Sequence, residues 1–347
     1  MPSPCHPPVA TRHSSPGWWP ATTPATGSWS PSSASRPIDA GIENPTERQP
    51  RHVNSNEHNP FVLAGQPPLP FEAAQAYEET VLDWARSQPL PPEIVVTRDC
   101  AYGADPQQRY DVYHREGAHD APILVFWHGG GWTNGYKEYV AFMAPIVVGL
   151  GMALVTPAYR LAPAHRLPAA FDDSLAAVAH AIGHAADFGG RGDRIYLAGH
   201  SAGAHLAALV ALRRQDAAQA GIPPAAIRAC LPISGIMDLH HPEPPADSLE
   251  ERIYTMVLND ASEDALMSPL CWTAGNDVPM WLSHGDSDSA RVIHSNRRMA
   301  ALLARQPGPS RLHVEPGLDH FATHTSLRDP AAPWYGRLAD LVKDHQP

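Results

Sequence analysis

The amino-acid sequence predicts an α/β protein with a mostly parallel central sheet of about eight strands, helices on both faces and a small cap. Two observations carry this prediction. Short β-type segments alternate with helical patterns from residue 94 onward, which is typical of a parallel sheet. Several of the β-type segments, such as ILVFW and ALVT, are continuous apolar runs, as expected for strands that are buried on both faces.

The elements follow in chain order. Residues 71–88 predict a first helix, because apolar side chains cluster toward one side of the stretch and prolines flank it. The candidate strands are 94–98, 109–114, 123–127, 152–156, 194–198, 229–233, 279–283 and 311–315. The later helical patterns lie near 138–149, 169–186, 202–215, 291–305 and 334–344.

Residues 1–57 stand apart from this pattern. The stretch is rich in Pro, Ser and Thr and shows neither helical nor strand periodicity. Such a composition buries too little apolar surface to offset its chain entropy, so we expect residues 1–57 to be disordered. We expect residues 58–347 to form the folded domain, with the segments 71–88 and 236–275 covering its pocket.

Composition narrows the classes of partner. Apolar residues make up 43% of the 347 residues, which is enough for a sizeable core, and the formal net charge of -11 argues against nucleic acid or an anionic membrane as a partner. No run of 18 apolar residues and no secretory signal pattern is present, so we expect a cytoplasmic protein without a transmembrane helix. The four cysteines are scattered and form no CxxC pair, which favours neither a zinc or redox motif nor a disulfide framework.

The segment IYLAGHSAGAHLAAL, residues 195–209, indicates a nucleophile. A predicted strand leads into Gly199-His200-Ser201-Ala202-Gly203, which matches G-x-S-x-G, and an Ala-rich helix follows. The turn is so sharp that side chains at 199 and 203 would collide with neighbouring elements. Ser201 is then held exposed in a strained conformation at a helix N-terminus, where backbone amides favour developing negative charge.

The segment ILVFWHGGGW, residues 123–132, indicates an oxyanion hole. A buried strand runs into His128 and three glycines, which let the backbone approach a substrate closely and present N–H groups. We expect the amides of Gly130, Gly131 and Ala202 to stabilise an oxyanion. We expect His128 to support this loop rather than to take part in catalysis.

An acid and a histidine then follow the serine in chain order. Asp288 lies after the predicted strand in VPMWLSHGDSD, with Asp286 as the alternative acid. His320 lies after the next strand in HVEPGLDHFATH, with His324 as the competing base. In this arrangement His320 takes the proton of Ser201 and Asp288 orients the imidazole.

The remaining candidates concern the pocket and metals. Trp132, His200 and Met237 are candidate substrate contacts, and Trp84 and Trp272 are further candidate wall residues; plain core packing is the alternative for each aromatic or Met side chain. The chain has 20 histidines, but no H-E-x-x-H or similar metal spacing appears, so we expect neither a metal nor a cofactor.

Taken together, HGGGW, Tyr159-Arg160-Leu161-Ala162-Pro163, LPAAFDD (167–173) and GHSAG resemble the hormone-sensitive-lipase-like branch of the α/β-hydrolases. That branch includes bacterial carboxylesterases and kynurenine formamidases. The resemblance covers roughly residues 70–345 and implies a cofactor-free acyl hydrolase with an acyl-enzyme intermediate. His200 stands where many relatives have Asp, and the segment 259–269 is similar to arylformamidases.

We therefore expect a serine hydrolase that cleaves carboxylic esters with short acyl groups through a Ser-His-Asp triad and an acyl-enzyme intermediate. Hydrolysis of a formamide such as N-formylkynurenine is the alternative within the enzyme class. A non-catalytic binding module on a hydrolase fold is the alternative outside it, because a fold alone does not prove activity. Dimerisation is common among relatives, so a homodimer is a further expectation.

Overall fold

The computed structural model describes residues 52–53 and 61–344. The predicted disorder of residues 1–57 therefore lies outside the described residues, with one exception. His52–Val53 form a short strand, β1, that pairs antiparallel with β2 (Ile94–Ala101), which corrects the expectation for these two residues. All described residues belong to one compact unit of the chain.

The described residues form a single sheet of nine strands in the order β1-β2-β3-β5-β4-β6-β7-β8-β9. The strands after β2 are β3 (Arg109–Arg115), β4 (Ala121–Trp127), β5 (Ala153–Pro157), β6 (Gly190–His200), β7 (Ile227–Ile233), β8 (Met280–Gly285) and β9 (Ser310–Glu315). Neighbours from β5 through β9 are parallel, whereas β1, β2, β3 and β5 pair antiparallel. The predicted mostly parallel sheet is confirmed.

The α-helices are α1 (Glu72–Ser87), α2 (Ala144–Gly149), α3 (Ala169–Gly183), α4 (Ala202–Leu212), α5 (Arg214–Gln219), α6 (Leu249–Arg252), α7 (Ala290–Leu303), α8 (Ala322–Thr325) and α9 (Pro333–Asp344). Six of these helices lie within or across the predicted helical patterns, namely α1, α2, α3, α4, α7 and α9, whereas the short helices α5, α6 and α8 were not predicted. Short 3-10 or π turns are η1 (Lys137–Met143), η2 (Ala185–Phe188), η3 (Ile253–Val257), η4 (Ala261–Glu263), η5 (Pro269–Trp272) and η6 (Ser326–Arg328). In the described part of the chain, no helix has the length and apolarity needed to cross a membrane.

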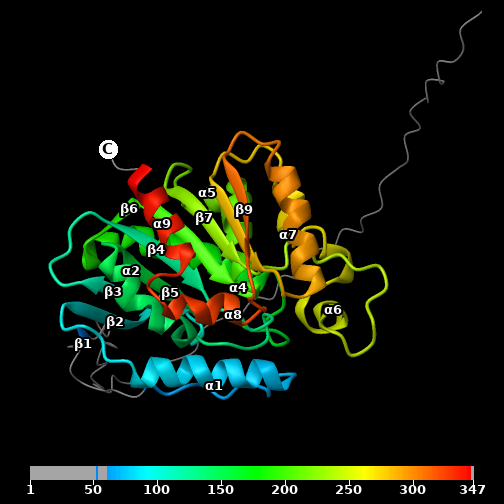
Figure 1. The fold of residues 1–347 in the computed structure, drawn as a ribbon, viewed down its shortest axis with the longest axis horizontal. Coiled ribbons are helices and arrows are strands. Elements are labelled where there is room, and N and C mark those ends of the chain that lie inside the picture. The colour runs from blue at the N-terminus through cyan, green and yellow to red at the C-terminus, as the bar shows by residue number, and fades with distance from the viewer. Residues whose placement is uncertain (1–51, 54–60, 345–347) are drawn as a thin grey trace, which may run out of the picture. The chain divides into compact units, whose positions relative to one another are not determined.

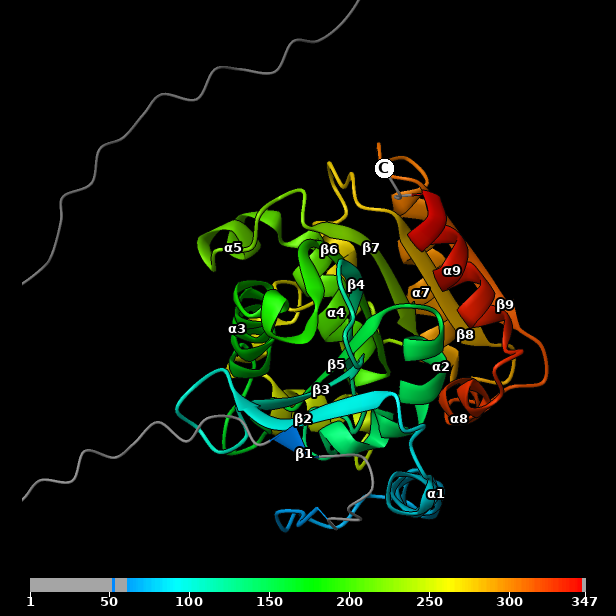
Figure 2. The ribbon, with the colours of Figure 1, turned by 90° about the vertical axis from the view of Figure 1, so that its left-hand side faces the viewer.

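Two hydrophobic cores cover the two faces of the sheet. Alternate residues of β4 point to opposite faces, so Val125 and Trp127 join one core and Leu124 and Phe126 join the other. Helices α3, α4 and α7 bury their apolar sides in the first core, and α1, α2 and α9 do so in the second. Figure 2 shows α3 and α2 on opposite sides of the sheet. This layering places the carboxyl ends of the parallel strands together at one edge, where ligands bind in such sheets.

Helix α1 lies along the bottom of the domain in the view of Figure 1. Its Tyr77 ring packs edge-on against Tyr139 of η1, with centroids 5.6 Å apart, and Trp84 packs against Phe142 at 5.2 Å. The guanidinium of Arg328 covers the other side of Trp84 at 4.4 Å. Trp84 is therefore a packing residue that joins α1 to η1 and η6, rather than a pocket wall.

Candidate active site

Ser201 sits in a tight turn between β6 and α4. Its backbone has φ 56° and ψ −118°, a region that non-glycine residues rarely adopt and that costs on the order of 1–3 kcal/mol. A Cβ atom at Gly199 would lie 2.5 Å from the carbonyl carbon and oxygen of Gly203. A Cβ at Gly203 would lie 2.2 Å from the carbonyl oxygen of Trp127. The close approach of these backbones explains why the turn contains glycine at both positions.

The structure brings Ser201, His320 and Asp288 together. The Ser201 hydroxyl donates to His320 Nε2 at 2.9 Å, and His320 Nδ1–H donates to Asp288 Oδ1 at 2.9 Å. Asp288 Oδ1 also accepts the backbone N–H of Ser289 at 2.8 Å. The three side chains come from the ends of β6, β8 and β9, so neighbouring parallel strands bring distant parts of the sequence to one place.

The surroundings of Asp288 keep it charged. Burial alone would raise the pKa of this carboxyl group, but the hydrogen bond and charge of His320, together with the Ser289 amide, leave the pKa below its usual 3.8. A carboxylate at this position accepts from the imidazole and favours the His320 tautomer that leaves Nε2 free to accept a proton.

The alternative acid and base have other partners. Asp286 is exposed, and its Oδ1 accepts the backbone N–H of Gly317 at 2.9 Å, which fixes the loop before His320. The buried His324 ring shares a hydrogen bond of 2.8 Å with the Tyr77 hydroxyl. Burial lowers the pKa of His324 to about 3, so this ring is neutral at ordinary pH. No described contact joins either residue to Ser201.

The glycine-rich loop after β4 passes directly beside Ser201. A Cβ at Gly129 would lie 3.1 Å from the Ser201 Cβ, and Gly130 and Gly131 have φ of +124° and +62°. Throughout residues 61–344, no protein acceptor receives the backbone N–H groups of Gly130, Gly131 or Ala202. Three backbone donors near the serine hydroxyl are thus left for another acceptor.

The YRLAP segment supports this loop. The ring of Tyr159 stacks on His128 with centroids 4.5 Å apart and planes inclined by 9°, and its hydroxyl donates to the His128 carbonyl at 3.1 Å. The Ala162 N–H donates to the Trp132 carbonyl at 2.9 Å. His128 is fully buried, and burial lowers its pKa to about 4, so it is a neutral packing group under the loop.

A second support comes from residues that the sequence patterns did not indicate. Gln66 donates to the Gly135 carbonyl and accepts the Gly135 N–H, both at 2.7 Å. Asn134 Nδ2 donates to the Pro67 carbonyl at 2.6 Å. Gln66 lies in a Pro-rich stretch without periodicity, so nothing in the sequence marked it as a residue that holds the oxyanion loop.

The expected substrate contacts need correction. Trp132, His200 and Met237 are 1%, 1% and 0% exposed, so a substrate has almost no surface of theirs to touch. Trp132 Nε1–H donates to His205 at 3.3 Å, and Met237 belongs to the same hydrophobic core. His200 Nε2–H donates to the His320 carbonyl at 2.8 Å. These side chains pack and support the site from within because other elements fold over them.

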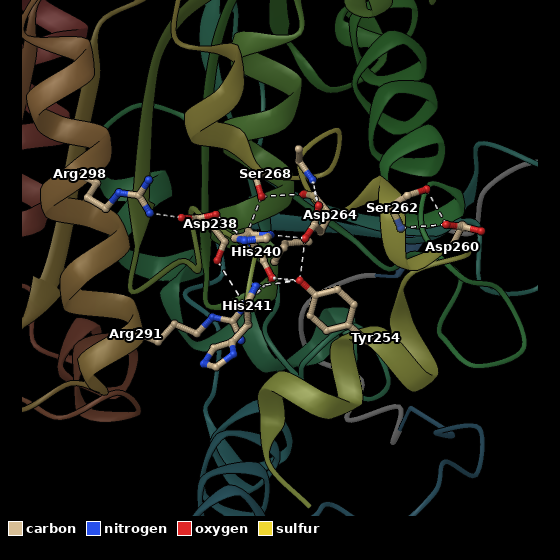
Figure 3. Close-up of polar contacts among 12 residues, drawn as sticks. Asp238, His240, His241, Tyr254, Asp260, Ser262, Asp264, Ser268, Arg291 and Arg298 are labelled. Carbon is tan, nitrogen blue, oxygen red and sulfur yellow. Dashed lines mark hydrogen bonds and ion pairs between the residues drawn. The ribbon is translucent and has the colours of Figure 1, made fainter. Parts of the chain in front are cut away.

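The segment from 236 to 275 carries the short elements α6, η3, η4 and η5 between β7 and β8. Figure 3 shows the polar contacts that hold it: Asp264 accepts from the Tyr254 hydroxyl and from His240 Nδ1–H, each at 2.7 Å. From α7, Arg291 donates to the Leu239 carbonyl at 2.8 Å, and Arg298 pairs with Asp238. The segment is thereby fastened to α7.

This segment also lies against the glycine-rich loop. The Leu249 Cδ1 atom is 3.9 Å from the position that a Cβ on Gly131 would occupy, and Arg252 donates to the Thr133 hydroxyl at 3.3 Å. Leu249 is 37% exposed, so its apolar side chain remains partly open to solvent at this place. Trp272, by contrast, lies under the guanidinium of Arg213 at 4.5 Å, which makes it a packing residue.

In the portion that the structure describes, no group of three or more His, Cys, Asp or Glu side chains is arranged to hold a metal ion. The cysteines Cys100, Cys230 and Cys271 are free thiols. Burial raises the pKa of the Cys230 thiol above its usual value, which disfavours the reactive thiolate.

Comparison with known proteins identifies the fold family and several esterases among the relatives. A family model described as the α/β hydrolase fold matches residues 124–324. Esterase LipC of Mycobacterium tuberculosis is 29% identical over 270 residues, which are 70% of this chain and 66% of that protein. Esterase LipQ of the same organism is 30% identical over 220 residues, covering 60% of this chain and 52% of LipQ. The matched region thus spans between half and two thirds of these relatives.

Among solved structures, the metagenomic carboxylesterase EstE1 superimposes with a TM-score of 0.66 at 21% identity, covering 81% of this chain and 99% of EstE1. At that identity the likeness shows the fold alone. The matched family region, however, runs from β4 through the His320 loop and includes more than half of the 347 residues. The chain belongs to the α/β hydrolase fold family.

Proposed function

We propose that this protein hydrolyses carboxylic esters with Ser201 as the nucleophile. The observation that carries the proposal is the unbroken chain of hydrogen bonds from Asp288 through His320 to the Ser201 hydroxyl, with 2.9 Å at each link. A nucleophile bonded to a base, which is in turn oriented by a third group, is the arrangement that activates serine. The names of the relatives LipC and LipQ, both esterases, support the same reaction.

In the acylation step, Ser201 Oγ attacks the ester carbonyl carbon while His320 Nε2 takes the hydroxyl proton. The carbonyl oxygen becomes an oxyanion, and the free N–H groups of Gly130, Gly131 and Ala202 are the donors for it. Asp288 remains ionised and stabilises the imidazolium. His320 then protonates the alkoxide as the carbon–oxygen bond breaks, which releases the alcohol and leaves an ester on Ser201.

In the second step, water attacks the acyl-enzyme and His320 takes its proton. The tetrahedral oxyanion uses the same three amides. Collapse of this intermediate returns the proton from His320 to Ser201 Oγ and releases the carboxylic acid. The strained backbone at Ser201 holds the hydroxyl at the start of α4, where the helix amides favour negative charge.

The test is the turnover of p-nitrophenyl acetate by the wild type and by Ser201→Ala. Removal of the nucleophile should lower kcat by several orders of magnitude, on the order of 10⁴-fold or more. The variant should keep the melting temperature of the wild type within a few degrees. Undiminished turnover by Ser201→Ala would overturn the proposal.

Two alternatives are decided by additional substrates and probes. A panel of p-nitrophenyl esters of graded chain length, formyl-anilides and N-formylkynurenine separates an esterase from an arylformamidase: a strong preference for the formamide would replace our first choice. Labelling with a fluorophosphonate separates an enzyme from a binding module. Wild type should label at Ser201, whereas a folded wild type that does not label would favour the binding module.

A further inference from the structure

His200 occupies an unusual place beside the proposed nucleophile. It is the last residue of β6, and its ring Nε2–H donates to the backbone carbonyl of His320 at 2.8 Å. The next residue, Ser201, bonds to the opposite end of His320 through imidazole Nε2. Two consecutive residues therefore hold the base at its backbone carbonyl and at its ring.

The His320 carbonyl has a second donor. The Thr323 hydroxyl donates to it at 2.7 Å, and the Thr323 and Ser234 hydroxyls share a further hydrogen bond of 2.8 Å. Both acceptor positions of the carbonyl oxygen are thus used by protein donors. Thr323 lies only three residues beyond His320, whereas His200 belongs to the strand that carries the nucleophile. Among the described residues, the hydrogen bond that ties the backbone of the base to the serine turn is the one from His200.

The His200 ring is itself held in place. It stacks on His324 with centroids 5.1 Å apart and planes inclined by 12°, and it lies 5.9 Å from the Tyr77 ring of α1. Tyr77 in turn bonds to His324 and stacks on Phe321 with centroids 5.0 Å apart. Burial is the main cause that lowers the pKa of His200 well below its usual value, and repulsion from the charged forms of His320 and His324 lowers it further. The ring is therefore neutral, and its bond to a carbonyl requires the proton on Nε2.

We propose that His200 is a positioning residue for the esterase reaction. Its hydrogen bond to the His320 carbonyl holds the backbone of the base where imidazole Nε2 accepts from the Ser201 hydroxyl. The inference rests on the proposed function. His200 does not touch the reacting atoms and acts only through His320. A leucine at this position keeps an apolar side chain of similar reach but has no donor. A glutamine keeps an N–H donor near the place of Nε2.

The experiment compares His200→Leu with His200→Gln in the full chain, using p-nitrophenyl acetate. For His200→Leu we expect kcat to fall about 10- to 100-fold, because small displacements of a catalytic group have effects of that size. KM should stay within about twofold, because His200 offers no surface to the substrate. His200→Gln should restore most of the lost kcat. A purely structural role would instead lower the yield or melting temperature without a selective loss of kcat that glutamine rescues.

His180→Leu is the control, since this half-buried histidine of α3 also bonds through its ring, to the hydroxyl of Tyr110, at 2.9 Å. Tyr110 belongs to the core on the other face of the sheet, away from His320. The kcat of His180→Leu should equal that of the wild type. Wild-type kcat in His200→Leu, or a loss in folded His200→Gln as large as in His200→Leu, would overturn the positioning role. If His200→Leu does not fold, His200→Gln is compared with the wild type alone. A kcat close to that of the wild type supports the positioning role, and a kcat lower by about 10-fold or more in a folded variant overturns it. The proposed function fails separately, through an active Ser201→Ala.

Discussion

Acidification from pH 7.5 to pH 5 should lower the free energy of unfolding strongly, because the folded protein buries several neutral histidines that become protonated when the chain unfolds. His128, His205 and His324 are fully buried, and His200 is 1% exposed. His128 sits under the glycine-rich loop, His205 joins Trp132 to the Met267 carbonyl, and the other two stack behind the proposed base. None of the four rings has a described carboxylate partner that would stabilise its charged form.

The size of the effect follows from the pKa values. Burial lowers the pKa of His128 and His205 from 6.5 to about 4, and that of His324 to about 3. The unfolded chain therefore binds more protons than the folded chain between pH 6.5 and pH 4, so the stability is fully present above pH 6.5 and is lost as the pH falls through this window. At pH 5 each of the three costs about 2 kcal/mol, or about 6 kcal/mol together. Total stabilities are usually about 5–15 kcal/mol.

Urea unfolding followed by tryptophan fluorescence measures this dependence at pH 7.5, 6.5, 5.5 and 5.0. Between pH 6 and pH 5 the free energy of unfolding should fall with a slope of about 3–4 kcal/mol per pH unit from these three groups. Replacement of one of them, in His205→Leu, should reduce the slope by about 1 kcal/mol per pH unit, whatever it does to stability at pH 7.5. A free energy of unfolding that stays constant from pH 7 to pH 5 would refute the reasoning.

Three further substitutions test other parts of the site. Asp288→Asn should lower kcat on the order of 10⁴-fold, because an amide favours the wrong imidazole tautomer. Asp286→Asn, which only loosens the loop at Gly317, should lower kcat far less. Steady-state kinetics measures both losses. Gly203→Ala should prevent soluble expression or abolish esterase activity, because its Cβ would lie 2.2 Å from a carbonyl oxygen of β4. The control is Gly183→Ala, whose Cβ would have no atom within 4 Å; its melting temperature should equal or slightly exceed that of the wild type. Tyr77→Phe leaves a buried histidine nitrogen unpaired and should cost about 1–3 kcal/mol in thermal unfolding, while kcat changes less than in His200→Leu.

The sheet and its helices were predictable from the sequence because their signals are local. A strand such as β4 is apolar at every position, since parallel strands are covered on both faces, and the helix patterns then fill the intervals. The serine turn was predictable for a related reason. The adjoining backbone leaves no room for a Cβ at its two glycines, so the G-x-S-x-G motif itself indicates a tight turn. The antiparallel pairing of His52–Val53 had no such signal, because two residues are too few to show alternation.

The approximate place of the acid and base was predictable as well, since both follow strands of the same parallel sheet. The His-Gly-x-x-Asp pattern favoured Asp288 over Asp286, but a pattern does not show where two side chains of one turn point. The fold gives each its partner: His320 for Asp288 and the Gly317 amide for Asp286. The support of the glycine-rich loop was least predictable. Contacts such as those of Gln66 with Gly135, or of Arg252 with Thr133, join segments whose own sequences show no periodicity.

His200 shows why such residues are misjudged from sequence. Its position next to the nucleophile suggested contact with substrate, and a polar ring beside a reacting serine is a natural candidate for that role. Whether the ring faces solvent depends on the loop that carries His320 and on α1, which close over it from remote parts of the chain. Once covered, a polar ring must find a partner inside the protein. The partner of this ring is the backbone carbonyl of His320, so His200 acts on the position of the base and not on the substrate. The Leu substitution removes this hydrogen bond and the Gln substitution keeps a donor, so the two variants separate positioning from packing.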